Sequence, residues 1–161
     1  MGADQTSAVS GLISNYLKTA HFQYKFDIDE LIWEAEYDDR PYAAHIYLKL
    51  YADRHELVFY IVADSSVPAA CEVNIIEYLT RVNFGLIIGN FEYDHNEAKI
   101  RFKSSLGFKG SEPAMPLIRH LIEPAFEAWT YYLPGAVEVI IGVESPVDAL
   151  RKLDQRTNSP L

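Results

Sequence analysis

The sequence predicts an α+β fold, in which an antiparallel sheet of about five strands packs against helices in the order α-β-β-β-α-β-β-α-α. Stretches of alternating apolar and polar residues follow one another across short polar turns, which is typical of an antiparallel meander. Other stretches carry apolar residues every three or four positions, which indicates helices with one buried face. Because the strands come in runs and do not alternate strictly with helices, the class is α+β.

The first half of the chain predicts one helix and three strands. The helix is expected from about Ser7 to Ala20, where apolar residues form one stripe: Val9, Leu12, Ile13, Tyr16, Leu17 and Ala20. Residues 21–30 mix aromatic and acidic side chains without a period and are expected to lead into the sheet. The strands are expected at 31–37, 44–50 and 57–63, separated by polar turns at 38–41 and 52–55.

A second helix and a hairpin are expected next. The helix should run from about Pro68 to Ile87 with a core-facing stripe, and Gly89 should end it in a left-handed conformation. Its expected stripe is Val73, Ile76, Leu79, Val82 and Leu86. The hairpin should pair Phe91–Asp94 with Lys99–Leu106 across the turn 94–97. Strand alternation directs Phe91, Ile100 and Phe102 to the core and leaves Arg101 and Lys103 exposed.

The C-terminal third predicts two more helices. One is expected from about Ala114 to Tyr132, with a stripe that includes Leu117 and a kink at Pro124. Residues 133–135 should interrupt it before an apolar run at 136–143. Ser145 is a good N-cap before Pro146, so a short last helix should start there and reach about Leu153. The whole chain, 1–161, is expected to be a single domain with an ordered core from 7 to 153 and frayed ends.

Composition excludes several classes of protein. The formal net charge of −9 argues against general nucleic-acid binding and against adhesion to anionic membranes. A basic cluster on one strand is interpreted as its solvated face: Lys99, Arg101, Lys103 and Lys109. No stretch is long and apolar enough to cross a bilayer, and no signal peptide is evident, so a cytoplasmic protein is expected. Cys71 is the only cysteine, which excludes an intrachain disulfide, and it is expected to be buried and inert.

The segment 79–106 carries a resemblance to a known family. Its order R-V-N-F-G-x-x-x-G-x-F-E-Y-D, followed by I-R-F-K-S-S-L, resembles the YbjN family of bacterial proteins. Shorter agreements follow at 121–124, at 132–135 and at Gly142 before Ser145. The family is described as proposed regulators of sensory transduction, with a fold similar to that of type III secretion chaperones. The resemblance therefore implies a chaperone-like fold and a dimer that holds a stretch of another protein.

No residue pattern indicates a catalytic, cofactor or metal site. The histidines lack ligand spacing, and the acidic residues from Asp27 to Asp39 are interpreted as a solvated surface that would attract a basic segment. Arg81 and Asn83 are polar residues in an apolar helix pattern. They form either a partner-binding pair or a structural pair, in which Arg81 meets an acid such as Glu92 and Asn83 ties the helix end to the next loop.

The sequence therefore favours a non-enzymatic protein-binding or regulatory domain without a cofactor. Its partner would be another protein or peptide segment, it would form a homodimer through the helix 68–87 or the adjacent strand edge, and it would bind neither nucleic acid nor membrane. The expected partner surface is the sheet face left open by the helices, and the candidate residues are Trp33, Tyr47, Tyr60, Arg81 and Asn83. Two alternatives remain: an enzyme whose site is assembled only in the fold, and a sheet that binds single-stranded RNA.

Overall fold

Six strands form one antiparallel sheet. The computed structural model describes residues 2–38, 42–111 and 113–157. The strand order is β1-β2-β3-β4-β6-β5, and every neighbouring pair is antiparallel. This confirms the α+β class. The strands are β1 Tyr24–Asp27, β2 Ile32–Tyr37, β3 Ala44–Tyr51, β4 Glu56–Ala63, β5 Asn90–Asp94 and β6 Lys99–Gly107.

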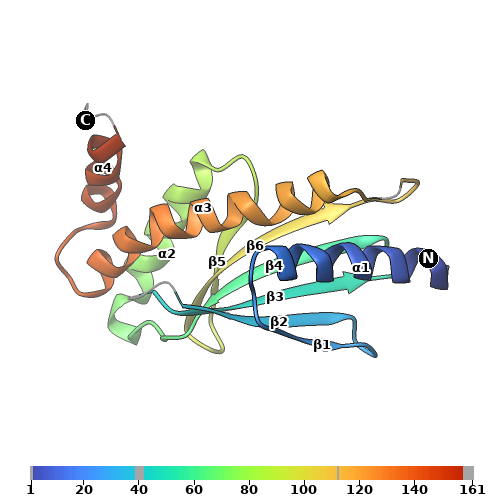
Figure 1. Ribbon diagram of the computed structural model, residues 1–161. Coiled ribbons are helices and arrows are strands. Elements are labelled where there is room, and N and C mark those ends of the chain that lie inside the picture. Colours follow the sequence, from blue (N-terminus) through green and yellow to red (C-terminus); the bar gives the residue numbers. More distant parts are fainter. Residues whose placement is uncertain (1, 39–41, 112, 158–161) are drawn as a thin grey trace.

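The helices leave one face of the sheet open. Helices α1 (Ala3–Thr19) and α3 (Met115–Ile140) lie across the same face (Figure 1). Helix α2 (Glu72–Gly85) packs beside β5, and α4 (Pro146–Thr157) packs on α2 and α3. On the opposite face of β2 and β3, the side chains of Glu34, Glu36 and His45 are exposed. No described helix covers that surface.

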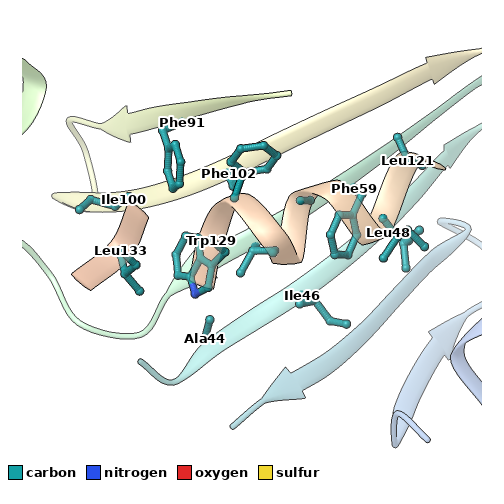
Figure 2. Packing of buried hydrophobic residues seen from close by; sticks show 14 of the residues in the cluster. Ala44, Ile46, Leu48, Phe59, Phe91, Ile100, Phe102, Leu121, Trp129 and Leu133 are labelled. Atoms are coloured by element: carbon teal, nitrogen blue, oxygen red, sulfur yellow. The ribbon is translucent and has the colours of Figure 1, made fainter. Parts of the chain in front are cut away.

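The core lies between α3, α1 and the covered face. Trp129 of α3 is fully buried and stacks on Phe91, with their ring centroids 6.1 Å apart. Phe102 meets Phe91 edge-on at 4.9 Å (Figure 2). These two aromatic residues and Ile100 are buried, as the hairpin prediction required. The register Phe91 to Phe102 and Glu92 to Arg101 confirms the predicted pairing of the two strands.

Strand β1 was not expected from the sequence, which raises the strand count from about five to six. Three of its four residues are exposed, so it lacks the alternation that marks a half-buried strand. It is positioned by the hairpin with β2, whose turn is closed by the Asp27 carboxylate. One oxygen of Asp27 accepts the backbone N–H groups of Asp29 and Glu30 at 2.9 and 3.0 Å.

Helix α2 is shorter and rotated relative to the expectation. It follows a 3₁₀ turn (Ala69–Cys71) and ends at Gly85, not at Ile87. The buried residues are Ile75, Tyr78, Leu79 and Val82, whereas Val73 is 77% exposed. Gly89 has the expected positive φ of 71°, but it precedes β5 and does not end the helix. A Cβ there would lie 2.5 Å from the Phe102 ring, so close packing against β6 requires glycine.

Helix α3 continues through the expected interruption at 133–135. It contains both Pro124 and Pro134 and reaches Ile140. Leu133 and Ala136 are buried, and this packing holds the segment helical despite the backbone donor that Pro134 lacks. Leu117, expected in the buried stripe, is partly exposed. The predicted start of α4 is confirmed, because the Ser145 hydroxyl accepts the N–H of Asp148 at 3.2 Å.

Candidate partner-binding surface

The open face of the sheet is formed by every second residue of each strand, the residues that point away from the helices. We use "open face" for the outward side chains of β2, β3, β4 and β6. The register aligns one row across the sheet, in which each residue lies opposite the next: Glu34, Tyr47, Tyr60, Lys103 and Asn90. Two of the sequence-predicted partner residues, Tyr47 and Tyr60, are therefore brought together as direct cross-strand neighbours.

Tyr47 and Tyr60 form a half-buried aromatic platform. The guanidinium of Arg101 lies 5.1 Å from the centre of the Tyr60 ring and at the same time donates from Nε to Glu92 at 2.7 Å. Partial burial, followed by the charges of Glu34 and Asp64, raises the pKa of Tyr47. Tyr47 thus remains a neutral phenol at physiological pH and offers an apolar ring with a hydrogen-bonding hydroxyl.

Charge divides the open face into two halves. Arg101 and Lys103 line β6, where the nearest carboxylate is Glu92, 2.7 Å from Arg101 and 3.7 Å from Lys103. At the other end, Glu34 and Glu36 line a hollow of 680 Å³. Its other lining residues come from β1–β3, from the loop between α1 and β1 and from the position after β2: Ala20, His21, Phe22, Gln23, Lys25, Ala35, Tyr37, Asp38, His45 and Tyr47. The acids of the predicted cluster from Asp27 to Asp38 are all exposed, and Asp39 lies outside the described residues.

Trp33 does not belong to the open face, and its assignment as a partner residue there was wrong. It is 1% exposed and lies on the covered face, one residue out of phase with Glu34. Its indole Nε1 donates to the Ser14 hydroxyl of α1 at 3.0 Å, and Phe26 stacks on its ring at 4.3 Å. Trp33 fixes α1 to the sheet.

Arg81 and Asn83 have different partners in the structure and do not act as a pair. Asn83 is tied to the loop as the structural interpretation expected: its side chain bonds both backbone groups of Phe91 at 2.8 Å. The expected pairing of Arg81 with Glu92 was wrong. Arg81 pairs with Glu77 one turn earlier at 2.8 Å, because Glu92 points across the sheet to Arg101. Of the two, Arg81 alone is exposed.

An apolar ridge beside α2 was missed by sequence reasoning. The ridge consists of Phe84 and Ile87, which are 95% and 97% exposed. A groove of 450 Å³ runs next to it between the loop after α2 and α3, lined by Gly85, Leu86, Ile87, Ile88, Pro124, Glu127, Ala128, Tyr131 and Tyr132. The signal is the run Leu86-Ile87-Ile88 between two glycines, which the helical pattern of the sequence assigns to the end of a buried helix.

Three other reactive side chains, Cys71, His95 and His45, have local partners. The Cys71 thiol, half-buried, donates to the Ile140 carbonyl at 3.2 Å. His95 contacts Glu72 at 3.0 Å, and His45 contacts Asp64 at 3.4 Å. Among the described residues, no three His, Cys, Asp or Glu side chains gather where they could hold a metal ion. Within the same residues, no helix is long and apolar enough to cross a membrane.

The fold places this chain beside two solved structures. The crystal structure of YbjN from E. coli, a candidate transcription regulator, matches with a TM-score of 0.56 at 10% identity, over 80% of this chain and 86% of that one. A chain of the ExsC-ExsE complex matches with a TM-score of 0.51 at 14% identity, over 79% of this chain and 92% of that one. The expected likeness to YbjN and to a type III secretion chaperone, ExsC, is confirmed as a likeness of fold. No family model matches the sequence. No curated protein matches it either.

Proposed function

We propose that this chain is a non-enzymatic regulatory domain that holds a segment of another protein on the open face of its sheet. The observation that carries the proposal is the Tyr47–Tyr60 pair at the centre of a face that no described helix covers. Rigid aromatic side chains flanked by charge are favoured at protein–protein contacts, because they bury much area at a low cost in conformational entropy.

The similar structures support a binding role over a catalytic one. YbjN is a candidate regulator, and the ExsC-ExsE structure is a complex of two proteins. At 10–14% identity they guide the class of function and not the partner. In the proposed role, the acidic end of the open face around Glu34 and Glu36 would receive basic side chains, and Arg101 and Lys103 would receive acidic ones.

We further propose that the domain is a homodimer joined through the apolar ridge. Phe84 and Ile87 stand almost fully in water next to a groove lined by apolar and aromatic side chains. A two-fold interface uses the same patch on both subunits, and a ridge beside a groove is self-complementary in that sense. Arg81 lies on the exposed side of the same helix and would border this interface.

Capture from the native host with two matched variants tests the binding role. The wild-type chain should retain a stoichiometric protein, and Tyr47→Ala with Tyr60→Ala should lose it. Ile28→Ala serves as the control, because it truncates an exposed apolar side chain outside both the open face and the apolar ridge. Retention of the same protein by the Tyr47/Tyr60 variant would refute the proposed surface. Nucleic acid that survives moderate salt would favour the RNA-binding alternative, which Arg101 over Tyr60 makes physically possible.

A further inference from the structure

Strand β6 has an unpaired edge over its last residues. It runs to Gly107, but its neighbour β5 starts at Asn90, which lies opposite Lys103. The backbone groups of Phe91 face outward, since they bond the Asn83 side chain. Along a strand, the N–H and C=O groups of one residue point to one neighbouring strand, and those of the next residue point to the other. The backbone groups that point toward the β5 side are therefore those of Arg101, Lys103, Ser105 and Gly107. At Ser105 and Gly107, no described strand receives them.

Two hollows lie on either side of this half-edge. On the covered side, a hollow of 370 Å³ is bounded by the loop before β5, by β6 and by α3, and its lining includes Ile88, Leu117, His120 and Leu121. Figure 1 shows the first half of α3 running alongside the end of β6. On the open side, a hollow of 310 Å³ is lined by Arg54, Lys103 and Ser105 among others.

The two hollows differ in chemistry. The covered one presents leucine and isoleucine side chains, and Leu117 is partly exposed without a covering element among the described residues. The open one holds two cations. Arg54 stacks over Tyr51 at 5.3 Å, and the nearest carboxylate to Lys103 is 3.7 Å away and is shared with Arg101. Glu56 also lines it, so basic side chains outnumber acidic ones there, in a protein of net charge −9.

We propose that the Ser105–Gly107 edge of β6 binds an extended segment of a partner protein with the pattern apolar–acidic–apolar. Residues of an added strand alternate between the two faces of the sheet. The acidic residue would lie opposite Ser105, exchange backbone hydrogen bonds with it and place its carboxylate near Lys103 and Arg54. The apolar residues on either side of it would enter the hollow under α3.

The spacing agrees with this arrangement. Two residues that flank a third in a strand are about 7 Å apart. Leu117 and Leu121 are four residues apart on α3, which corresponds to about 6 Å along a helix. The inference rests on the proposed function in taking the ligand to be a protein segment. It uses the free edge of β6, and its open-side hollow borders the platform at Tyr60 but does not include Tyr47.

A peptide titration followed by ¹⁵N NMR tests the inference. The capped peptide Ser-Leu-Glu-Leu-Ser should shift the amide signals of Ser105, Gly107 and His120 saturably. Replacing its glutamate by lysine should weaken binding by about fivefold or more, because the carboxylate contacts are replaced by repulsion. Methylating the backbone nitrogen of the glutamate should weaken it similarly, because that N–H bonds the Ser105 carbonyl.

Protein variants separate binding at the β6 edge from binding at Tyr47. Ser105→Pro should abolish the shifts, and it should fold, because proline is tolerated where a strand's N–H has no partner. Tyr47→Ala, which changes a residue outside both hollows, should leave the titration unchanged even if it weakens partner capture. Absent shifts, shifts confined to other surfaces, or equal binding of the lysine or N-methyl peptide would overturn the inference. So would a wild-type dimer that Ser105→Pro dissociates without peptide binding, since the edge would then bind a second copy.

Discussion

Asn83 pairs with Phe91 as a neighbouring strand would. Its Nδ2 donates to the Phe91 carbonyl and its Oδ1 accepts the Phe91 N–H, both at 2.8 Å. The amide side chain at the end of α2 thereby satisfies the outward backbone groups of the second residue of edge strand β5. An unpaired strand edge invites association with other chains, so Asn83 protects β5 as well as anchoring α2.

Asn83→Ala should destabilise the fold by about 2 kcal/mol, because it leaves the partly buried Phe91 N–H without its partner and the Phe91 C=O with only a long 3.4 Å bond from Asn90 Nδ2. Asn83→Asp keeps the acceptor and loses the donor, so it should fall between Asn83→Ala and the wild type above pH 6. Urea unfolding measures both. Asn74→Ala, an exposed position on the same helix, is the control. Equal midpoints for Asn83→Ala and Asn74→Ala would contradict the pairing.

Gly135→Ala should destabilise the protein although alanine favours helix. A Cβ at Gly135 would lie 2.3 Å from the Tyr78 hydroxyl oxygen, which donates to the Tyr132 carbonyl at 2.7 Å. We expect a loss of about 1–3 kcal/mol from this overpacking. Gly85→Ala, where nothing lies within 4 Å of the new Cβ, is the matched control and should cost far less.

The clash at Gly135 has its own test by a double-mutant cycle. Tyr78→Phe removes the hydroxyl and its hydrogen bond, which should cost about 1 kcal/mol alone. Combined with Gly135→Ala, it should cost less than the sum of the two changes, because the oxygen that the methyl group meets is gone. Additive effects in thermal or urea unfolding would show that Gly135 is required for another reason.

Local patterns predicted the hairpin but not the edges and helix ends. Phe91, Ile100 and Phe102 alternate with polar residues around a strong turn, so their faces follow from the sequence. Strand β1 could not be found in this way, since its exposed residues carry no alternation and its partner strand positions it. Leu133 and Ala136 keep α3 helical through Pro134, and this packing against other elements outweighs local propensity.

Only part of the candidate site could be predicted from the sequence, because some of its contacts depend on the order of the strands in the sheet. Alternation placed Tyr47 and Tyr60 on a shared face, and hairpin pairing made them neighbours. The same alternation, applied consistently, would have placed Trp33 in the core. The approach of Arg101 to Tyr60 depends on β4 lying next to β6, which no local pattern reveals. The free half-edge at Ser105 likewise depends on where β5 begins relative to β6.

Asp94 should make a pH-dependent contribution to stability. Its carboxylate accepts the N–H groups of Asn96 and Glu97 at 2.8 and 3.3 Å, and these bonds lower its pKa below the ordinary value of 3.8. A lowered pKa in the folded state means that the contribution is present above pH 3.8 and is lost as the pH falls through the folded pKa. Urea midpoints of wild type and Asp94→Asn should therefore differ at pH 7 and converge as the pH falls below 3.8 and through the folded pKa. A constant difference would contradict this assignment.

Charged substitutions on the apolar ridge should dissociate the proposed dimer without unfolding the subunit. Phe84 and Ile87 make few contacts within the chain, being 95% and 97% exposed, so Phe84→Glu and Ile87→Asp should change the free energy of unfolding of the monomer by no more than about 0.5 kcal/mol. At a two-fold interface each charge would be buried without a partner and would meet its own copy.

Ile28→Asp is the control, an exposed apolar position near β1, at the opposite end of the sheet from β5. In sedimentation at micromolar concentration, the wild type and Ile28→Asp should run at about twice 18.3 kDa and the ridge variants at 18.3 kDa. A wild-type species at 18.3 kDa, or a dimer that survives both ridge substitutions, would refute this interface.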